Sequence, residues 1–600
     1  MKLQEIEKKI AERFKNIPEY RASISSLELR RDRGDKSEAI PLANGTLLLE
    51  RYIKRNDGVE TKTEVKLLAV YTNAFGNTDV ESMTLSLEDL KPAKLEGKLP
   101  GAFCPMYQGA LWYICNSVKV QIDRCELIYS HTGWIKPDGE TRPVFLHGGG
   151  AIGASSEIKV ELDGQLSPYS FSAENHEDKW DVFKQFARVA PKRIMYPLIA
   201  FAALSPLNHF MREAGEEPAF LMFLYGKTGT RKSTLAALLL SLFGKFNNKA
   251  LPSSFKDTAK SLEFKGQMLA DVLTVIDDFH PTANKQEKTE MDSKFQYLCR
   301  SYGDRTGRSR LNADATEGKR YVPKGNALIT GEYFPDVSES GYSRLLNLEL
   351  KSGDVDLTLL SEVQSKADRL SECMRDYISW LQEMSEKLPE ALHELFLRYR
   401  ERVSGKGQHG RTPEITAHLL TSAKIGVYFL EKNKVITEEE AEHIVKETEG
   451  ILQEIAAEQS AAIKENDPCT VFLNELNSAI ESNALKFSDS FECTLGRKLS
   501  NNSTIAGYAD DEFYYLHMLT CLGYMKESLN RRGDGSRIAL DDKTLKKRLV
   551  EAGYAKAWPD GKPEHKKRFG SQSIRVLYLK KSAFAEITGA ELETGQPLTA

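Results

Sequence analysis

A strand-forming run, a glycine-containing loop and a helix-forming run follow one another directly near the middle of the chain. In order they are 221–225, Gly226, Gly229, Lys232, Ser233 and 235–243. Strand, tight loop, Lys-Ser and helix is the layout that cradles the phosphates of a nucleoside triphosphate. Glycines let the backbone turn its N–H groups toward phosphate oxygens, and the helix adds its own unpaired N–H groups and positive dipole end. The stretch therefore predicts a phosphate-binding loop in an α/β sheet.

The charged and hydroxyl side chains of this loop have separate predicted roles. Lys232 places a full charge against the β- and γ-phosphates, and Ser233 offers its hydroxyl to Mg²⁺. Arg231 stands where the consensus has its second glycine, so we expect it to take a helical φ and point away from the phosphates. A chance strand–helix loop is the alternative. The predicted ligand-binding residues are Gly226, Lys227, Thr228, Gly229, Thr230, Arg231, Lys232, Ser233 and Thr234.

Two further apolar runs end in polar side chains. The run 272–279 ends in Asp277 and Asp278. At the C-terminal end of a parallel strand, Asp277 is placed to hold Mg²⁺ together with Ser233, and Asp278 to orient or deprotonate the attacking water. The run 326–332 carries Thr330, a candidate sensor of the γ-phosphate. The alternatives are a solvated Asp-Asp turn and a Thr-Gly turn that merely ends a strand.

Arginines and lysines gather after the carboxylate run. Arg344 lies just before another apolar run and could reach the nucleotide of a neighbouring subunit. A hairpin over 311–321 is predicted in the basic insert, which suits contacts with a phosphate backbone. The alternative for Arg344 is an exposed arginine at a helix end. The alternative for the insert is a solvated basic face. The predicted DNA-contacting residues of the insert are Arg308, Arg310, Lys319 and Arg320.

Bulk composition excludes several classes. The length of 600 residues predicts roughly three to five domains. A net charge of −4 does not indicate a nucleic-acid partner, so local basic clusters must carry that argument. Eight cysteines without a C-x-x-C pair argue against a zinc site or a disulfide framework and fit a reducing cytoplasm. The charged N-terminus lacks a signal-peptide core, and no apolar run approaches the ~20 residues of a membrane helix.

The pattern along the chain predicts four regions. Residues 1–175 are β-rich, with strands expected at 46–53, 65–71 and 118–122. Residues 176–355 alternate strand and helix, which predicts a parallel sheet with the phosphate loop. Residues 356–465 are helical and charged, as in a lid or linker. Residues 466–600 are mixed α and β.

The last region carries a basic module. Between 531 and 581 there are fifteen Lys/Arg against six Asp/Glu. A helix at 544–553 and a hairpin at 566–580 predict a winged helix, with the helix near the major groove and the wing on phosphates. A protein-binding winged helix or a solvated basic face is the alternative. We expect the helix cations to point outward, and the predicted DNA-binding residues are Lys546, Lys547, Arg548, Lys566, Lys567 and Arg568.

Taken together, these strings resemble a known family. The order of phosphate loop, Asp-Asp strand, basic insert, Thr-Gly-Glu and Ser-Arg-Leu-Leu looks like an AAA+ ATPase. More narrowly it is similar to the MCM-like replicative helicases of staphylococcal cassette chromosomes, pathogenicity islands and related phage elements. The matching strings are HTGW at 131–134, GKTGTRKS at 226–233, VIDDFHP at 275–281, ITGE at 329–332 and SRLL at 343–346.

The resemblance implies a fold and an activity. The fold would be multidomain α/β, with a β-rich N-terminal region that binds DNA or a partner or forms a collar of the ring, an AAA+ core with a helical lid and a C-terminal winged helix. The activity would be that of a cytoplasmic hexameric ring that hydrolyses ATP with Mg²⁺ and unwinds DNA in the 3′→5′ direction. Its partners would be single-stranded and forked DNA, further copies of the chain and replication proteins of the mobile element. Arg344 would act in the neighbour's site, and Arg411 would be a second sensor at the start of a lid helix or, alternatively, a surface arginine.

Two other functions stay open at this stage. The first is an AAA+ origin-binding initiator that marks or melts DNA without translocating, which an unwinding assay on forked DNA separates from a helicase. The second is a non-enzymatic DNA-binding scaffold with a degraded nucleotide site, which DNA-stimulated ATP hydrolysis excludes. A small-molecule P-loop kinase fits poorly, because that chemistry needs neither a finger nor a basic C-terminal module.

Overall fold

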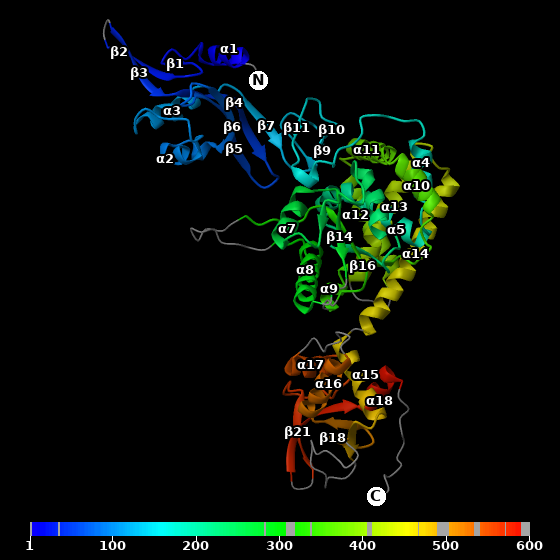
Figure 1. The fold of residues 1–600 in the computed structure, drawn as a ribbon. Coiled ribbons are helices and arrows are strands. Elements are labelled where there is room, and N and C mark those ends of the chain that lie inside the picture. Colours follow the sequence, from blue (N-terminus) through cyan, green and yellow to red (C-terminus); the bar gives the residue numbers. More distant parts are fainter. Residues whose placement is uncertain are drawn as a thin grey trace.

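The computed structural model shows three parts arranged along the chain (Figure 1). A β-rich N-terminal part lies at one end, an α/β part with many helices lies in the middle, and a smaller part holds the C-terminal sheet. The residues that the structure describes are 3–33, 36–280, 282, 284–307, 319–335, 339–404, 411–465, 467–488, 503–532, 541–569 and 572–589.

The N-terminal part is built around a long antiparallel pair, β4 and β5. Its sheet has the order β11-β7-β4-β5-β6, and alternate residues such as Leu47, Leu49, Val65 and Leu67 pack in one core with α1 and α3. The elements of this part are α1 Leu3–Phe14, β1 Tyr20–Ala22, β2 Leu27–Arg33, β3 Lys36–Ala43, β4 Gly45–Asn56, β5 Thr61–Thr72, β6 Thr78–Ser86, α2 Pro92–Leu95, α3 Ala110–Lys119, β7 Cys125–Tyr129, β8 Gly133–Ile135, β9 Val144–His147, β10 Gly150–Ile152 and β11 Lys159–Val160.

Two of the three predicted N-terminal strands are confirmed and one is wrong. The predictions at 46–53 and 65–71 fall inside β4 and β5. The run 118–122 is instead the end of α3 and the turn after it. Ala110, Ile114 and Val118 repeat every fourth residue and are all fully buried, so this run completes an apolar helix face that a short window reads as strand alternation.

The middle part contains the predicted parallel sheet, which is confirmed. Its order is β13-β14-β15-β12-β16, and every neighbouring pair is parallel. Because all strands point the same way, the loops after β12, β14 and β15 meet at one edge. The strands are β12 Leu221–Tyr225, β13 Ser253–Ser254, β14 Leu273–Phe279, β15 Asn326–Gly331 and β16 Leu345–Glu349, and the helices are α5 Lys192–Glu213, α6 Lys232–Leu240, α7 Ala259–Met268, α8 Lys285–Gly303 and α9 Glu339–Tyr342.

Both faces of this sheet are covered. Met222 and Leu224 of β12 pack in the same core as α5 and α6, whereas Leu221 and Phe223 pack with α8 on the other face. Such burial on both sides explains the continuous apolar run of β12. Helix α5 is long and apolar enough to cross a membrane, yet 83% of its most apolar window is buried inside the protein. Among the described residues, no other helix meets that test.

Five further helices follow β16, and three of them, α12, α13 and α14, contact α5. They are α10 Leu357–Ser365, α11 Asp368–Glu383, α12 Leu388–Val403, α13 Arg411–Lys432 and α14 Glu438–Glu465, and α4 Lys179–Phe186 joins them. This confirms the predicted helical region. Leu419, Ile378 and Leu392 share one continuous core with the sheet. Trp134, Phe145 and Tyr169 also belong to that core, although they precede residue 175.

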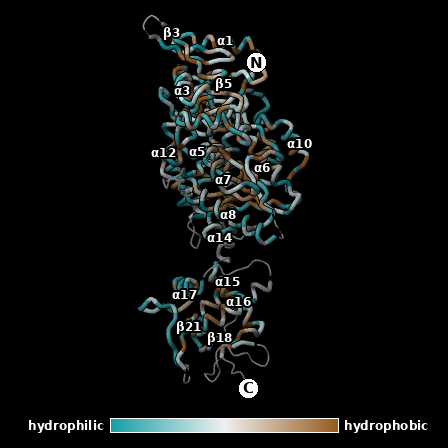
Figure 2. The backbone as a smooth tube through the Cα atoms, turned by 60° about the vertical axis from the view of Figure 1, so that its left-hand side comes forward, coloured by the Kyte–Doolittle hydropathy of each residue, from teal (hydrophilic) through white to brown (hydrophobic). Residues whose placement is uncertain are grey.

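The C-terminal part has a core of its own. Figure 2 shows it as a separate body beyond α14. Its sheet has the order β17-β18-β19-β21-β20, and Leu473, Leu516, Leu545 and Leu577 meet in its core. The predicted basic helix and hairpin are both present as α17, β20 and β21. The elements are α15 Pro468–Glu481, β17 Leu485–Ser488, β18 Thr504–Ala509, β19 Phe513–Leu516, α16 Met518–Arg532, α17 Asp542–Glu551, β20 Glu564–Phe569, β21 Gln572–Lys580 and α18 Lys581–Thr588.

Candidate active site

The predicted phosphate loop lies between β12 and α6. The Gly226 amide donates to the Gly331 carbonyl at 3.1 Å, which ties the loop to the end of β15. A Cβ atom on Gly226 would lie 2.1 Å from the Leu350 carbonyl oxygen, so only glycine fits where the loop crosses β16's end. Lys227, Thr228 and Gly229 form the exposed crest of the loop. The backbone therefore curls over an open edge of the sheet, as the sequence predicts.

Arg231 contradicts its predicted conformation. Its φ of 72° and ψ of 21° are left-handed, whereas a helical φ is predicted from the sequence. The loop needs a left-handed residue just before α6. Glycine adopts that conformation without strain, which explains why the consensus has glycine at this position. A non-glycine residue in this region costs about 1–2 kcal/mol. The Arg231 side chain is exposed, so the strain is confined to the backbone.

We expect the shape of residue 231 to affect nucleotide binding. Arg231→Gly removes the backbone strain and keeps the loop, whereas the branched side chain of Arg231→Val is a poor fit for a left-handed φ. The valine variant should bind a fluorescent ATP analogue about tenfold more weakly than the glycine variant. Equilibrium titration of the two purified proteins checks this, and equal affinities would contradict it.

Lys232 lies inside the loop as a cation without a carboxylate partner. Its Nζ donates to the carbonyls of Gly226 at 2.8 Å and Lys227 at 2.9 Å. Its side chain forms no ion pair with any described residue, and the residue is 8% exposed. Burial lowers the pKa of the Lys232 ammonium, while the charges of Glu332 and Asp277 act in the opposite sense. A desolvated ammonium ringed by carbonyls at an open loop is suited to phosphate oxygens.

Three elements bring oxygen atoms together beside Lys232. Ser233 Oγ, at the start of α6, donates to Asp277 Oδ1 at 2.8 Å. Thr330 Oγ1, on β15, donates to the same oxygen of Asp277. Hydroxyl and carboxylate oxygens are the ligands that Mg²⁺ prefers. The side chains therefore fit a magnesium ion at the predicted residues, with Thr330 orienting Asp277.

Asp278 lies in β14 next to Asp277, at an irregularity of the strand. A register shift interrupts the β14–β15 pairing between Ile276 and Phe279, and Asp278 has a φ of 74°. Its carboxylate is 41% exposed and lies 3.3 Å from His280 Nδ1 and 3.4 Å from Lys256 Nζ. Left-handed non-glycine residues cluster at functional sites, and Arg231 and Asp278 both lie at this edge of the sheet. The accessible carboxylate can accept a proton from water.

Arg344 lies at the other end of the sheet. It precedes β16, and its carbonyl accepts from the Leu221 amide at the start of β12. Its guanidinium binds both oxygens of Asp304, at 2.7 Å and 3.0 Å, and the residue is 9% exposed. Because β12 and β16 are parallel, Arg344 is a strand's length away from the phosphate loop of its own chain.

Arg411 joins Arg344 rather than the phosphate loop. At the start of α13, it donates to the Gly303 carbonyl at 2.7 Å and to Asp304 Oδ1 at 3.0 Å. Asp304 therefore holds both predicted nucleotide-sensing arginines. Asp304 is not among the residues predicted from the sequence, and the one signal for it is its place directly after a long charged helix.

The described part of the basic insert is bound to the rest of the protein. Arg308 and Arg310, and most of the predicted hairpin, lie outside the described residues. Lys319 forms ion pairs with Asp57 at 2.5 Å and Glu60 at 2.7 Å, in the turn between β4 and β5. Arg320 is exposed and donates to the Gly307 carbonyl at 2.9 Å. Lys319 is thus not the free cation that the sequence indicates, but a link to the N-terminal sheet.

The predicted cations of the C-terminal module separate into two groups. The expectation that the helix cations point outward is wrong for Lys546, which is paired with Asp542 at 2.7 Å and Glu564 at 2.9 Å. Lys567 lies over the Tyr515 ring, 3.3 Å from its centroid. Arg548 is partly buried, whereas Lys547, Lys566 and Arg568 are exposed.

Sequence reasoning missed Arg575. It lies on β21 directly opposite Lys566 of β20, and both side chains are exposed. Like charges directly opposite each other destabilise a strand pair by roughly 0.2–1 kcal/mol. Neither of the two forms an ion pair with a described residue. The alternation of strand residues was the available signal, because it puts Lys566, Arg568 and Arg575 on one face of the hairpin.

The HTGW string at 131–134 forms hydrogen bonds to two other segments of the chain. Thr132 Oγ1 donates to the Ala270 carbonyl at 2.8 Å, and the Trp134 amide donates to Asp271 Oδ2 at 3.1 Å. The Trp134 indole donates to the Pro206 carbonyl at 2.8 Å. The string therefore fastens the chain after the N-terminal sheet to the base of β14 and to α5.

The sheet, the loop and the carboxylates define a phosphate-loop α/β fold, and known structures place it more closely. The chain is similar to a solved structure described as "SCCmec type IV Cch - active helicase", with a TM-score of 0.57, 16% identity, and coverage of 96% of this chain and 99% of that chain. This similarity shows a helicase-like fold along nearly the whole chain.

More distant similarities cover only parts of the chain. The JCV helicase matches with a TM-score of 0.20 and 14% identity, over 41% of this chain and 65% of that chain. A putative ATPase from Cytophaga hutchinsonii matches with a TM-score of 0.21 and 11% identity, over 45% and 87%. Neither a protein-family model nor a curated protein matches the sequence.

Proposed function

We propose that this chain is an ATP-dependent DNA helicase, a ring-forming AAA+ motor that acts in the cytoplasm to initiate replication of a mobile genetic element. The observation that carries the proposal is the convergence of Lys232, Ser233, Asp277 and Thr330 at one edge of a parallel sheet, with Asp278 exposed beside them. The similarity of the whole fold to an active helicase supports it.

The side chains divide the hydrolysis between them. Lys232 and the loop amides bind phosphate oxygens, and Ser233 and Asp277 hold Mg²⁺, which neutralises charge on the phosphates. Thr330 fixes the rotamer of Asp277 through its hydrogen bond. Asp278 accepts the proton of the attacking water, and its exposure keeps it within reach of solvent.

A second copy of the chain completes the site. Arg344 and Arg411 lie together at the N-terminal ends of the strands, away from the loop of their own chain. In a head-to-tail ring this end of one subunit faces the phosphate edge of the next, which is the arrangement that an arginine finger in trans requires. The neighbour's phosphates then compete with Asp304 for the two guanidinium groups. A hexamer is the proposed ring.

The C-terminal part is the proposed duplex-binding module. The order of α16, α17 and the β20–β21 hairpin supports the proposal of a winged helix, whose sheet also contains β17, β18 and β19. The basic face of the wing consists of Lys566, Arg568 and Arg575. Bound phosphates relieve the repulsion between Lys566 and Arg575, which lie opposite each other. Two further residues, Lys547 and Arg320, remain proposed DNA contacts outside the wing. Lys319 can contact DNA only after its ion pair with Asp57 breaks.

We expect the wing to set the salt dependence of duplex binding. Each phosphate contact contributes about −0.9 to the slope of log K against log salt concentration. The double variant Arg568→Ala/Arg575→Ala should therefore flatten that slope by about two. Fluorescence anisotropy with a short duplex at several salt concentrations measures it. Lys119→Ala, an exposed lysine on α3, is the control, and an unchanged slope in the wing variant contradicts the assignment.

Unwinding of a forked duplex tests the function itself. The purified chain with ATP and Mg²⁺ should separate the strands, hydrolyse ATP faster when DNA is added, and form closed rings around DNA in particle images. DNA-stimulated hydrolysis without strand separation would favour an origin-binding initiator. Duplex binding without any hydrolysis would favour a DNA-binding scaffold. Omitting single element-encoded replication proteins from a reconstituted reaction identifies the loading partner.

A further inference from the structure

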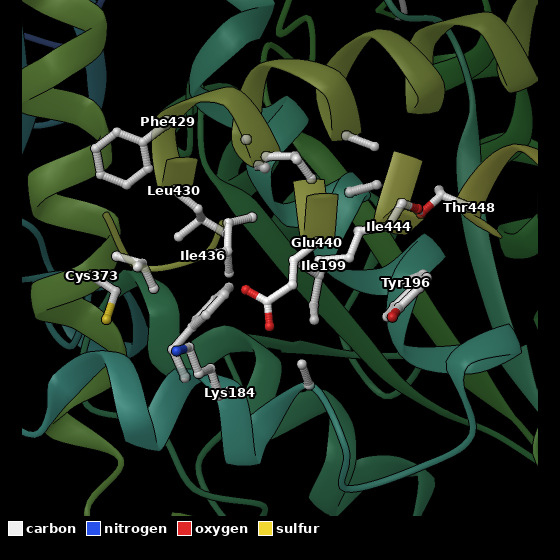
Figure 3. Close-up of a pocket in the computed structure, with 18 of the residues that line it drawn as sticks. Lys184, Tyr196, Ile199, Cys373, Phe429, Leu430, Ile436, Glu440, Ile444 and Thr448 are labelled. Atoms are coloured by element: carbon white, nitrogen blue, oxygen red, sulfur yellow. The ribbon is translucent and has the colours of Figure 1, made fainter. Parts of the chain in front are cut away.

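A cavity of about 630 Å³ lies between α4, α5, α11, α13 and α14 (Figure 3). Its volume falls within the range of about 300–1,000 Å³ that small-molecule sites occupy. Trp180, Phe183, Tyr377 and Phe429 supply an aromatic wall, and none of the lining residues belongs to the phosphate loop. The cavity therefore lies in the helical layer, apart from the residues assigned to ATP.

The hydroxyl group of Tyr377, which lines the cavity, forms no hydrogen bond with a described residue. The residue is 4% exposed. A buried hydroxyl without a partner costs about 1–3 kcal/mol. The hydroxyl oxygen has almost no accessible surface, so Tyr377 contributes its ring to the cavity wall and its hydroxyl is not a ligand contact.

Gly426 keeps the cavity open. It lies within α13, where a glycine costs about 1 kcal/mol relative to alanine. A Cβ atom at Gly426 would face only the Cβ of Ala203, 3.9 Å away on α5, and both residues line the cavity. Glycine therefore makes α13 less stable at a position where a larger side chain would occupy the cavity.

Two cations stand on one wall of the cavity. Lys184 and Arg188 are exposed, four residues apart, and neither forms an ion pair with a described residue. Like charges at this spacing repel, so an anion between them is stabilising. Figure 3 shows the Glu440 carboxylate reaching in between Ile436 and Ile199, and one of its oxygens accepts from the Thr437 amide at 2.8 Å. The negative charge of Glu440 opposes an anionic group beside it, so Lys184 and Arg188 are the place for the anionic group of a ligand.

We propose that this cavity is a second ligand site, separate from the phosphate loop, for a small apolar anion. The aromatic or branched aliphatic body of the ligand fills the space beside Gly426 and Phe429. A carboxylate, sulfonate or phosphate group faces Lys184 and Arg188. The proposal does not depend on the function proposed above.

The aromatic sulfonate 8-anilinonaphthalene-1-sulfonate is the probe for a fluorescence titration of the full chain. The wild type should bind it saturably with one site per chain. Gly426→Leu fills the cavity and should weaken binding at least about tenfold, whereas Gly450→Leu, the same change at an exposed glycine of α14 that does not line the cavity, should leave it unchanged. Circular dichroism confirms that both variants are folded.

Further arms test the charge of the site and its separateness from the phosphate loop. Lys184→Glu/Arg188→Glu should weaken binding about tenfold. Indole-3-acetate, with an aromatic body, and 4-methylpentanoate, with a branched aliphatic body, should each displace the probe, and neutral indole should displace it less than indole-3-acetate. Equal binding by Gly426→Leu and Gly450→Leu overturns the site. Displacement by ATP in the wild type but not in Lys232→Ala overturns its separation from the phosphate loop.

Discussion

We expect Lys232→Ala to lower the proposed ATP hydrolysis by about a hundredfold or more and to prevent strand separation. The expected size follows from what the side chain does, because Lys232 places a positive charge in a partly desolvated loop where phosphate charge must be stabilised. Neighbouring backbone amides cannot replace a full charge. DNA-stimulated release of phosphate and unwinding of a forked duplex, measured on the same preparations, check this expectation.

The matched control for this variant is Lys249→Ala. Lys249 is an exposed lysine after α6, outside the site. Its loss should leave hydrolysis unchanged, which excludes a general effect of removing a lysine from this region. Asp278→Asn gives an independent view, because it retains the shape of the side chain but cannot accept the proton of water. Normal hydrolysis by either Lys232→Ala or Asp278→Asn would remove the assignment of this edge as the active site.

Local patterns were enough to find this edge of the sheet. An apolar strand, its terminal polar residues and the helix that follows are all encoded within about a dozen residues, and parallel strands bring such ends together. That is why Ser233, Asp277 and Thr330 could be predicted and are found in contact. The same local reasoning failed at 118–122, because only a longer window contains Ala110 and Ile114 and so shows the helical period.

The backbone conformation of Arg231 could not be inferred from its residue type. Steric preference argues for a helical φ, but the loop closes only with a left-handed residue before α6, and the protein accepts the strain. The consensus glycine marked this position, so the departure from the consensus signalled strain rather than a different path of the chain.

Charge partners distant in sequence could not be predicted either. Lys319 and Asp57 are 262 residues apart, and their ion pair depends on how the N-terminal sheet meets the insert. Asp304 lies 40 residues before Arg344 and 107 before Arg411. A count of local charges makes Lys319 a free cation and Asp304 an incidental acid. The observed ion pairs show that Lys319 holds the insert to the N-terminal sheet and that Asp304 binds both Arg344 and Arg411.

Arg344→Ala should lower ATP hydrolysis about a thousandfold while leaving nucleotide binding to the phosphate loop of its own chain nearly unchanged. The reason is geometric, because Arg344 lies at the end of the sheet that its own loop does not occupy. Arg344→Lys keeps a positive charge beside Asp304 but loses the two-pronged contact, so it should be similarly inactive and better folded. Binding of a fluorescent ATP analogue and phosphate release separate the two effects.

Mixing two inactive variants distinguishes an arginine that acts across a subunit boundary from one that is merely structural. Lys232→Ala chains retain Arg344, and Arg344→Ala chains retain the phosphate loop, so a mixed ring contains interfaces at which both are intact. Random mixing in equal amounts makes about a quarter of the interfaces complete, and hydrolysis should recover in that proportion. Adding the double variant Lys232→Ala/Arg344→Ala to Arg344→Ala supplies no intact arginine and should restore nothing. If mixed rings form without any recovery, Arg344 holds Asp304 within one chain and does not serve the neighbour's nucleotide.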